Sequence, residues 1–584
     1  MPRIAIIERD KCLKEKCGYV CQKVCPGVLM GDETVVVDSE GYPVISEILC
    51  TGCGICPKKC PAKCIYIINL EEEKGKLMHQ YGVNTFRIYG MPLPQQGITG
   101  LVGKNGIGKS TALSILSGNI LPNLGNFKNP PPLEELLPKL TKPEAKYFKE
   151  MQGKQIKVAL KPQNVDKIPA VVKGKVKALL EKADERGALG EAIALFSLEK
   201  VLSKNLDEIS GGELQRVAIA ACWCKNADMY YFDEPASYLD ISQRLRVAKA
   251  LKKLGEGKKV IVVEHDLALF DYVSDYVYVF FGQEHAYGMV SGLKSTRAGI
   301  NQYLHGFLNE ENIRFRENEI KFQKGAAVSR KGHVKFEYPA FEKKFEGFSF
   351  ASDSGKINRG EVIGIVGENA IGKTLFVKML SGALDSDNEN KMEQKIKVSY
   401  KPQYVKAQEG VTALELFSRY KINGAFFEEA QRRLGVAPLM DKMLDTLSGG
   451  ELQRVSIVLA LSQEADLYLL DEPSAFLDVE QRLQFAQLVQ SLIENSGKSA
   501  FVVDHDLVLI DAISSRIMHF EGKPSSNGHA GAPSEKREGL NKFLKGLGIT
   551  LRRDVDTHRP RINKPDSVMD KKQKEAGEYY YYEG

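Results

Sequence analysis

The sequence predicts an α/β protein with two P-loop nucleotide-binding domains in tandem, preceded by a small α+β domain rich in cysteine. Three observations support this fold class. A phosphate-binding loop occurs twice, the motifs around it recur in the same order, and nine of the eleven cysteines precede residue 65. At roughly 150 residues per domain, the length allows about three to four domains. We expect domains at 1–72, 73–298 and 331–539, with a hinge at 299–330 and a second hinge and tail at 540–584.

The composition is that of an ordinary globular protein, with 43% apolar residues and a net charge of +6. The N-terminus lacks the basic start and long apolar stretch of a signal peptide. No apolar run approaches the roughly 18 residues of a membrane span. We therefore expect a cytoplasmic protein, in a compartment where disulfides are disfavoured. The charge permits a nucleic-acid partner but does not require one.

The N-terminal cysteines fall in two runs that each end in Cys-Pro. The second run, at 50–61, reads C-x2-C-x2-C-x3-C-P, as in bacterial ferredoxins, and the first, at 12–26, is a stretched form of it. In two-cluster proteins the last cysteine of each run binds the other cluster. The predicted 4Fe–4S ligands are therefore Cys12, Cys17, Cys21 and Cys60 for one cluster, and Cys50, Cys53, Cys56 and Cys25 for the other.

Zinc is the alternative ligand for these thiols. Zinc sites usually use two well-separated C-x2-C pairs, which triplets followed by Cys-Pro do not match. Cys64 has no place in either set and is expected to pack, as are Cys222 and Cys224 on a buried helix. The segment 33–46 alternates and turns like a short hairpin. Residues 1–70 thus resemble a two-cluster bacterial-type ferredoxin.

The rest of the chain repeats itself. "GKNGIGKST" at 103–111 recurs as "GENAIGKTL" at 367–375, and "SGGELQRVAIA" at 210 recurs as "SGGELQRVSIV" at 448. "DEPASYLD" and "VVEHDLALFD" also recur, as "DEPSAFLD" and "VVDHDLVLID". From Gln163 and Gln403 onward the copies stay 238 to 240 residues apart. Chance does not give the same order and spacing twice, so we infer two copies of one domain.

Each copy carries the loop G-x-x-x-x-G-K-[ST] between an apolar strand and a helical pattern. Its backbone N–H groups surround phosphates, its lysine reaches the β- and γ-phosphates, and its hydroxyl can hold Mg²⁺. Ala370 replaces Gly106 in the second copy, which we expect the loop to tolerate. The predicted nucleotide-binding residues are Gly103, Asn105, Gly106, Gly108, Lys109, Ser110 and Thr111 in the first loop, and Gly367, Asn369, Gly372, Lys373, Thr374 and Leu375 in the second.

Two apolar strands, "YYFDE" and "YLLDE", end in paired carboxylates. We expect Asp233 and Asp471 to bind Mg²⁺, and Glu234 and Glu472 to polarise the attacking water. Two solvated acids at a strand end would be the alternative for one copy alone, but the matching motifs on either side argue against it.

Together these motifs resemble those of the ATP-binding-cassette (ABC) ATPases, and "SGGELQR" matches the signature of that family. The resemblance implies that two cassettes face head to tail, with ATP between the P-loop of one and the signature of the other. It implies catalytic roles for His265 and His505 at the γ-phosphate, and adds Gln163 and Gln403 to Ser110 and Thr374 as magnesium ligands. The signature residues are Ser210, Gly211, Gly212 and Glu213, which join the second P-loop, and Ser448, Gly449, Gly450 and Glu451, which join the first.

An aromatic ring is expected to stack on each adenine, upstream of the P-loop. Tyr81 and Phe345 each lie 22 residues before the first glycine of their loops, and Phe86 is a third candidate. Aromatic residues on strands more often belong to the core, which is the alternative for all three.

The first copy contains extra residues around 130–154, which predict a helix–loop–helix about "LTKPEA". A tolerated surface loop is one interpretation, and a binding surface made by its lysines is the other. The hinges repeat as well, since 300–316 echoes 540–554, and we expect both to pack together at the cassette interface. Their Arg314, Arg316, Arg552 and Arg553 serve either as anchors or as braces. The tail from 570 onward is expected to be loosely ordered.

The whole architecture resembles the ribosome-recycling ABC ATPases of archaea and eukaryotes, the RNase L inhibitor or ABC-E family. The resemblance implies a monomeric ATP hydrolase that uses ATP/ADP, Mg²⁺ and two structural 4Fe–4S clusters, and splits ribosomes by cassette closure. The implied partners are the ribosome, its small subunit and rRNA, a release factor and initiation factors, without a membrane. A detached transporter ATPase and a DNA-repair ABC ATPase are disfavoured by the fused N-terminal unit and by the lack of heptad arms. An ATP-driven iron–sulfur electron-transfer or assembly ATPase is the remaining alternative.

Overall fold

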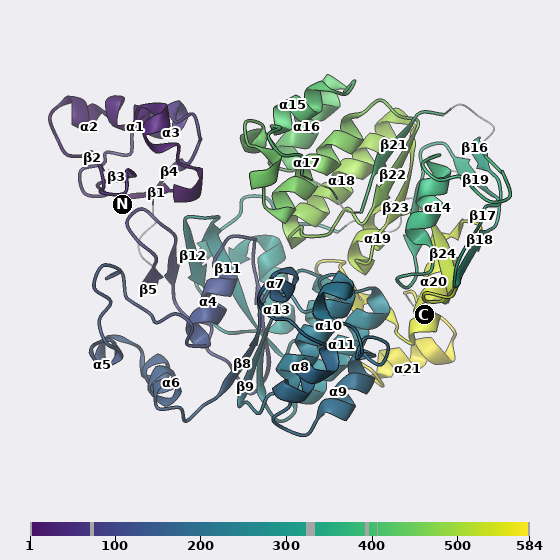
Figure 1. The fold of residues 1–584 in the computed structure, drawn as a ribbon, viewed down its shortest axis with the longest axis horizontal. Helices are drawn as coiled ribbons and strands as arrows, with labels where there is room; N and C mark the ends of the chain where they lie inside the picture. The colour runs from purple at the N-terminus through teal and green to yellow at the C-terminus, as the bar shows by residue number, and fades with distance from the viewer. Residues whose placement is uncertain are drawn as a thin grey trace.

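The computed structural model describes residues 3–69, 75–322, 333–391, 396–403, 405 and 407–581, which form a small N-terminal unit and two α/β cassettes (Figure 1). The expected domain boundaries after residues 72 and 330 lie outside the described residues. Within the described chain, no helix has the length and apolar character needed to cross a membrane.

The N-terminal unit is closed by its first and last strands, β1 (Arg3–Ile7) and β4 (Ile65–Asn69), which pair antiparallel. The predicted hairpin is confirmed, because β2 and β3 pair antiparallel between the two cysteine runs. Buried cysteines form much of the small core of this unit. The elements between the outer strands are α1 (Val20–Lys23), α2 (Pro26–Leu29), β2 (Val35–Val37), β3 (Pro43–Ile45) and α3 (Ile55–Lys59).

The N-terminal unit rests on the first cassette and touches the second. The Asn84 side-chain amide of the first cassette donates to the carbonyls of Ala5 at 2.8 Å and Ile45 at 3.0 Å. On the other side, Lys63 Nζ lies 3.4 Å from Asp441 of the second cassette, an exposed ion pair that contributes little stability. The unit is therefore fixed to one cassette and only lightly attached to the other.

The first cassette is built on a nine-stranded sheet in the order β5-β6-β12-β11-β7-β10-β9-β8, with β13 beside β11. Its parallel strands from β11 to β8 are covered on both faces, which explains their almost continuous apolar sequences. The strands are β5 (Leu77–Gln80), β6 (Arg87–Tyr89), β7 (Gly97–Val102), β8 (Val158–Lys161), β9 (Met229–Asp233), β10 (Lys259–Val263), β11 (Tyr276–Gln283), β12 (Tyr287–Val290) and β13 (Lys294–Ser295).

Helices cover this sheet. Cys222 and Cys224 are buried at the C-terminal end of α10, as predicted. The helices of the first cassette are α4 (Lys109–Leu116), α5 (Leu133–Leu136), α6 (Lys142–Gln152), α7 (Ile168–Val171), α8 (Val176–Ala183), α9 (Leu189–Phe196), α10 (Gly211–Trp223), α11 (Ile241–Gly255), α12 (Leu267–Val273) and α13 (Thr296–His305). Two short strands follow, β14 (Phe307–Leu308) and β15 (Ile313–Arg314).

The second cassette repeats this sheet as β17-β18-β25-β24-β20-β23-β22-β21, with β26 beside β24. The strands of this sheet are β17 (Glu342–Phe345), β18 (Phe348–Ser352), β20 (Val362–Val366), β21 (Val398–Lys401), β22 (Leu467–Asp471), β23 (Ser499–Val503), β24 (Arg516–Lys523), β25 (Asn527–Ala530) and β26 (Ser534–Glu535). A separate antiparallel pair is formed by β16 (Val334–Tyr338) and β19 (Gly355–Asn358). Its helices are α14 (Lys373–Leu380), α15 (Ala413–Ser418), α16 (Gly424–Arg433), α17 (Gly449–Ser462), α18 (Val479–Ser496), α19 (Leu507–Ile513) and α20 (Lys536–Leu547).

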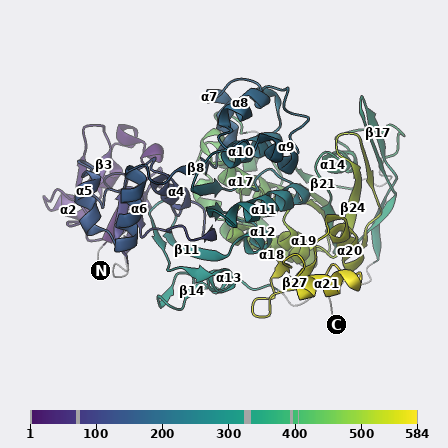
Figure 2. The ribbon, with the colours of Figure 1, turned by 90° about the horizontal axis from the view of Figure 1, so that it is seen from below.

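The insert of the first cassette forms the two predicted helices, α5 and α6, joined by a short 3₁₀ turn. It is anchored by buried Tyr147 and Phe148 on α6 and by Leu133 and Leu136 on α5. The Tyr147 hydroxyl lies 2.7 Å from that of Tyr231, inside the sheet core. The insert lies toward the same end of the molecule as the N-terminal unit (Figures 1 and 2).

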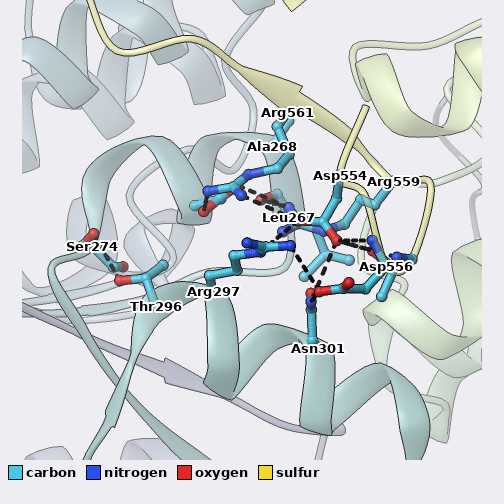
Figure 3. Close-up of polar contacts among 12 residues, drawn as sticks. Leu267, Ala268, Ser274, Thr296, Arg297, Asn301, Asp554, Asp556, Arg559 and Arg561 are labelled. Atoms are coloured by element: carbon cyan, nitrogen blue, oxygen red, sulfur yellow. Dashed lines mark hydrogen bonds and ion pairs between the residues drawn. The ribbon is translucent and has the colours of Figure 1, made fainter. Parts of the chain in front are cut away.

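The second hinge joins the cassettes through a hairpin of β27 (Leu551–Arg553) and β28 (Pro560–Ile562), followed by α21 (Val568–Glu575). Figure 3 shows Arg297 and Asn301 on α13 in contact with Asp554 and Asp556 of this hairpin. The two hinges therefore pack together, as predicted.

Two equivalent aspartates hold this C-terminal region. Buried Arg559 and its neighbour Arg561 bind Asp271 on α12 of the first cassette. On α19 of the second cassette, Asp511 accepts hydrogen bonds from the hydroxyls of Tyr580 and Tyr581. The prediction of a loosely ordered tail is wrong as far as residue 581, because these tyrosines are anchored by a buried carboxylate.

Most of the hinge arginines contact the second cassette or are partly buried, and do not face solvent fully. Arg316 binds Glu480 of the second cassette at 3.3 Å, and Arg553 lies 3.5 Å from Asp511. Arg552 is half-buried, and only Arg314 is exposed. Of the two alternatives for these residues, bracing fits Arg316 and Arg553.

Candidate functional site

The two P-loops connect β7 to α4 and β20 to α14, and their lysines turn back into the loops. Lys109 Nζ donates to the carbonyls of Gly103 at 2.8 Å and Lys104 at 2.6 Å. Lys373 Nζ makes the equivalent bonds in the second loop, at 2.7 Å each to Gly367 and Glu368. The helix N-termini and the ammonium groups thus face the same small loop, the arrangement that binds phosphates.

Two glycines precede the lysines because no side chain fits there. Gly108 has φ 95° and Gly372 has φ 101°, both left-handed. A Cβ at Gly372 would lie 2.3 Å from a ring carbon of Phe350, and one at Gly108 would lie 2.6 Å from Phe86. The loop tolerates Ala370 at φ 58°, where an alanine costs about 1–2 kcal/mol relative to right-handed backbone.

Asp233 and Asp471 end β9 and β22 and are buried beside the hydroxyls of the P-loops. Thr374 Oγ1 donates to Asp471 at 2.8 Å, and the Ser110 hydroxyl binds Asp233 in the same way. Among the described residues, one oxygen of each aspartate has no hydrogen-bond partner. Burial, and then the nearby Glu234 or Glu472, raises the pKa of each aspartate to about 6. A free, buried carboxylate oxygen beside a hydroxyl is the oxygen-donor set that Mg²⁺ prefers.

Glu234 and Glu472 follow the strand ends and each contact a glutamine and a histidine. Gln163 Nε2 donates to Glu234 Oε1 at 2.6 Å, and Gln403 Nε2 donates to Glu472 Oε1 at 2.8 Å. The Nε2 atoms of the predicted histidines lie 3.5 Å and 3.4 Å from the same oxygens. The structure therefore brings together, in each cassette, the glutamate, glutamine and histidine that the sequence places far apart.

The electrostatics keep the glutamates ionised and the histidines neutral. Burial alone would raise the pKa of Glu234, but the close approach of His265 and the charge of Lys109 outweigh it and lower that pKa to about 2. The same causes lower the pKa of Glu472 to about 2. Burial and the lysine ammonium lower the pKa of both His265 and His505. A neutral imidazole can still donate its Nε2–H to the carboxylate.

The cassettes face each other head to tail, so each site uses residues of both. Asp240 of the first cassette accepts from the backbone N–H of Asn369 at 2.8 Å, and Asp478 of the second accepts from that of Asn105 at 3.2 Å. One cleft is lined by Lys373, Gln403 and Glu472 on one side and by the signature segment from Ser210 to Glu213 on the other. The signature serines cap α10 and α17 by accepting from the backbone N–H groups of Glu213 and Glu451.

The three aromatic candidates lie at different depths. Tyr81 is 50% exposed, and its hydroxyl lies 3.2 Å from Thr111 of the first P-loop. Phe345 is similarly exposed in the second cassette, whereas Phe348 lines the cleft. Phe86 packs beneath Gly108. Adenine stacking stays a prediction for Tyr81 and Phe345, while Phe86 supports the P-loop from behind.

Sequence reasoning missed several site residues that the repeat could have identified. Asp240 and Asp478 occupy the same place in "SYLD" and "AFLD". Lys161 and Lys401 precede the two glutamines in "KPQ", and both donate to backbone carbonyls at the end of the carboxylate strand. Equivalence between the copies was the available signal in each case.

The N-terminal cysteines line two separate hollows that match the two predicted ligand sets. The first hollow is lined by Cys12, Cys17, Cys21, Cys60 and also Cys64. The second hollow is lined by Cys25, Cys50, Cys53 and Cys56. Among the described residues, no three metal-binding side chains gather as they would around a single ion. Cysteine thiolates are the usual ligands of iron–sulfur clusters, so the residues of each hollow fit such a group.

Cys64 is buried, and its sulfur lies 3.6 Å from that of Cys60. Cys64 therefore packs against the predicted ligand Cys60 and also lines the first hollow.

Comparisons with known proteins find relatives that match nearly the whole chain. A family model described as ABC transporter matches residues 88–237 and 350–475. The chain is 43% identical to ABC transporter E family member 1 of Arabidopsis thaliana, over the full chain and 99% of that protein. It is 42% identical to translation initiation factor RLI1 of Saccharomyces cerevisiae, over 99% of the chain and 98% of that protein.

Solved structures show the same arrangement of parts. An archaeal ABCE1, in a model of its ribosome-bound state with Pelota, is 47% identical over 99% of each chain, with a TM-score of 0.92. The archaeal ribosome recycling factor aABCE1, crystallised with the ribosomal stalk protein aP1, is 47% identical over 88% of this chain and all of its own, with a TM-score of 0.83.

Proposed function

The chain belongs to the ABC-E family of ATPases, and from that membership we propose that it is a ribosome recycling factor, which splits ribosomes into subunits by ATP-driven closure of its two cassettes. The observation that carries the proposal is the match over 99% of its length to a ribosome-bound ABCE1. That match includes both cassettes and the N-terminal unit. The proposed location is the cytoplasm, where ribosomes work.

Hydrolysis would use the same set of groups in each cassette. Glu234 or Glu472, held ionised, accepts a hydrogen bond from the attacking water and polarises it. The histidine beside it donates to the γ-phosphate, and the P-loop lysine neutralises charge on the transferred group. A magnesium ion, held by Ser110, Asp233 and Gln163 or by Thr374, Asp471 and Gln403, would add positive charge at the phosphates. The signature helix of the other cassette completes the site with its N-terminal N–H groups.

Approach of the two cassettes can move the N-terminal unit, because the unit is attached more firmly to the first cassette than to the second. The unit is bonded to the first cassette through Asn84, whereas its attraction to the second comes from the exposed Lys63–Asp441 pair, beside which the ammonium groups of Lys11 and Lys442 approach each other. When the cassettes approach, the unit must move with the first cassette and slide against the second. The proposed output of ATP binding is therefore a displacement of this unit against factors on the ribosome.

We assign two structural 4Fe–4S clusters to the two cysteine hollows, with the ligand sets predicted from the sequence. The support is that each hollow is lined by one predicted set of four. Iron and acid-labile sulfide would be measured in protein purified without oxygen, with about eight irons expected per chain. Cys25→Ser should lower the iron content, whereas Cys64→Ser should leave it unchanged. Stoichiometric zinc with negligible iron would reject the assignment.

The insert is the proposed contact with ribosomal RNA. Its five lysines, Lys139, Lys142, Lys146, Lys149 and Lys154, are all exposed. Of the nearby acids, Glu144 is buried, because it closes the capping box at the start of α6. The exposed face is therefore more basic than the sequence suggests, and its helices are rigidly anchored on the sheet. Such a surface suits phosphate contacts.

Sedimentation with purified small ribosomal subunits tests the proposed function. The protein should co-sediment strongly with a non-hydrolysable ATP analogue and weakly without nucleotide. A release factor and initiation factors are proposed as further partners at this stage. Equal binding in both nucleotide conditions would reject ATP-driven closure as the basis of ribosome binding.

A further inference from the structure

A lysine of each cassette is buried beneath the catalytic carboxylates, and the scheme above gives it no role. Lys161 ends β8 and Lys401 ends β21, each two residues before the glutamine of its site. Their exposed fractions are 1% and 0%. A buried ammonium normally pairs with a carboxylate, yet in the described chain neither lysine forms an ion pair. Burying an ammonium group without an ion pair costs free energy, and the same burial occurs at the equivalent position of both cassettes. We therefore looked for a function of these two lysines in the contacts they make.

Both ammonium groups point at the backbone that carries the catalytic glutamate. Lys161 Nζ donates to the carbonyl of Asp233 at 2.8 Å and to that of Glu234 at 3.2 Å. In the second cassette, Lys401 Nζ makes the same two bonds at 3.0 Å and 3.2 Å. The parallel pairing of β8 with β9 sets this register, because Lys161 lies opposite Phe232, one residue before Asp233.

The backbone held in this way is strained. Glu234 has φ 48° and Glu472 has φ 45°, in the left-handed region that few non-glycine residues adopt. Strain of this kind persists only where the surroundings fix the backbone from several sides. A second donor acts on the same carbonyls: Gln215 on the signature helix binds that of Glu234 at 2.7 Å, and Gln453 binds that of Glu472 at 2.8 Å.

We propose that Lys161 and Lys401 are positioning residues for ATP hydrolysis, which hold the left-handed glutamates so that their carboxylates meet the attacking water. The proposal rests on the catalytic role proposed for Glu234 and Glu472. A charged donor holds a carbonyl more firmly than a neutral one, and the long side chain reaches across from the neighbouring strand. Displacing a catalytic group by about 1 Å can cost about 100-fold in rate.

The test is the double variant Lys161→Met/Lys401→Met, in which methionine keeps much of the length and removes both charge and donors. Loss of the desolvated charge favours stability and loss of the buried hydrogen bonds opposes it, so the thermal midpoint is measured to show that the variant is folded. The KM for ATP should stay within about twofold, and kcat should fall about 10- to 100-fold. The variant Lys161→Arg/Lys401→Arg should recover part of kcat, because it restores a charged donor.

Lys294→Met is the matched control, since Lys294 is also buried in the first cassette but pairs with Glu310 and Glu311 away from the ATP sites. Its kcat should equal that of the wild type. Wild-type kcat in the methionine double variant would overturn the proposal. So would a joint loss of folding and activity in the methionine and arginine variants, which would mark the lysines as structural.

Glu234→Gln/Glu472→Gln, measured in parallel, separates this inference from the proposed function. If that variant still hydrolyses ATP at the wild-type rate, the catalytic assignment itself is wrong. If it is inactive while the methionine double variant is not, only the positioning role fails.

Discussion

The two cassettes differ in the position of one serine, which follows the Asp-Glu pair one residue later in the first cassette than in the second. Because of this shift, the serine hydroxyl binds a different carboxylate in each cassette. In the first cassette, "DEPAS" puts Ser237 Oγ 3.1 Å from Glu234, the proposed catalytic base. In the second, "DEPSA" puts Ser474 Oγ 2.7 Å from Asp504, the residue before the histidine. The first glutamate thus has one more side-chain donor than the second. Identical motifs therefore surround two sites that restrain their catalytic groups differently, and equal turnover at the two sites is not expected.

The outer surfaces of the cassettes differ as well. Only the first cassette carries the N-terminal unit and the lysine-bearing insert, whereas both keep the same nine-stranded sheet. If the insert is the proposed RNA contact, ribosome binding should depend more on the surface of the first cassette than on that of the second. Four predictions address this division.

The largest effect is expected from removing the catalytic carboxylates. Glu234→Gln and Glu472→Gln keep the side-chain shape but lose the negative charge, so the double variant should lose about 10²- to 10⁴-fold in kcat. Nucleotide binding should persist, because the P-loops and signatures are intact. The double variant should also stay on small subunits with ATP, as measured by sedimentation.

Comparison of the two single variants tests the difference between the sites. Unequal kcat values for Glu234→Gln and Glu472→Gln would support unequal restraint of the two glutamates. Equal values would show that the extra Ser237 bond has no consequence for turnover.

The second prediction concerns the insert. Deleting it would expose Tyr147, Phe148 and the core beneath them, so reversing its surface charge is the cleaner change. Lys142→Glu/Lys146→Glu/Lys149→Glu should weaken binding to small subunits and flatten its dependence on salt, by about one unit of log–log slope per lost phosphate contact. Basal ATPase activity should be unchanged.

Three exposed lysines of the second cassette, Lys344, Lys378 and Lys421, supply the control for that experiment. Reversing their charges should leave binding and its salt slope unaltered. If both triple variants weaken binding equally, the effect comes from net charge and the insert is not the anchor.

The third prediction concerns the shifted serine. Ser474→Ala removes a hydrogen bond to a buried carboxylate, which should cost about 1.5–3 kcal/mol. For a domain of this size, about 2–4 °C per kcal/mol gives a lower thermal midpoint of about 3–12 °C. Ser237→Ala should act instead on kcat, because its partner is the catalytic Glu234. Calorimetry and ATPase assays on both variants would show whether stability and activity separate in this way.

The smallest effect is expected at the P-loops. Ala370→Gly relieves a left-handed alanine, worth about 1–2 kcal/mol, but loses about 0.5–1 kcal/mol to chain entropy. The thermal midpoint should therefore rise by no more than a few degrees. Gly106→Ala should lower it, because a Cβ there would also lie 3.1 Å from His285. A fall for Ala370→Gly would contradict the strain argued for this residue.

Much of the fold and the site could be predicted because the motifs encode local geometry. A P-loop dictates its strand, turn and helix, and cysteine spacing dictates which thiols can share a cluster. Partners far apart in sequence carry no such local pattern. The bond between Asp478 and Asn105 depends on how two folded cassettes meet, so neither residue stood out beforehand.

The tail shows the opposite case, in which composition predicts disorder for a segment that is ordered by distant contacts. Residues 570–581 read as polar and aromatic, which favours disorder when no partner is visible. Their partner, Asp511, lies about 70 residues earlier in the chain and is buried on α19. Burial of Lys161 was equally hidden, because a lone lysine in a sequence is normally assigned to the surface.

The C-terminal hairpin has a consequence for how the protein is made. Its arginines bind Asp271 of the first cassette, and the residues that follow bind Asp511 of the second. The hairpin follows both cassettes in the chain, so during synthesis it leaves the ribosome after each sheet is complete. Each cassette can thus fold before the hairpin emerges, and the hairpin then adds its bonds to the contacts that Arg316 and Asp240 already make with the second cassette. A nascent chain that stops before the hairpin therefore lacks the ion pairs with Asp271 and the hydrogen bonds with Asp511 that tie the C-terminal region to both cassettes.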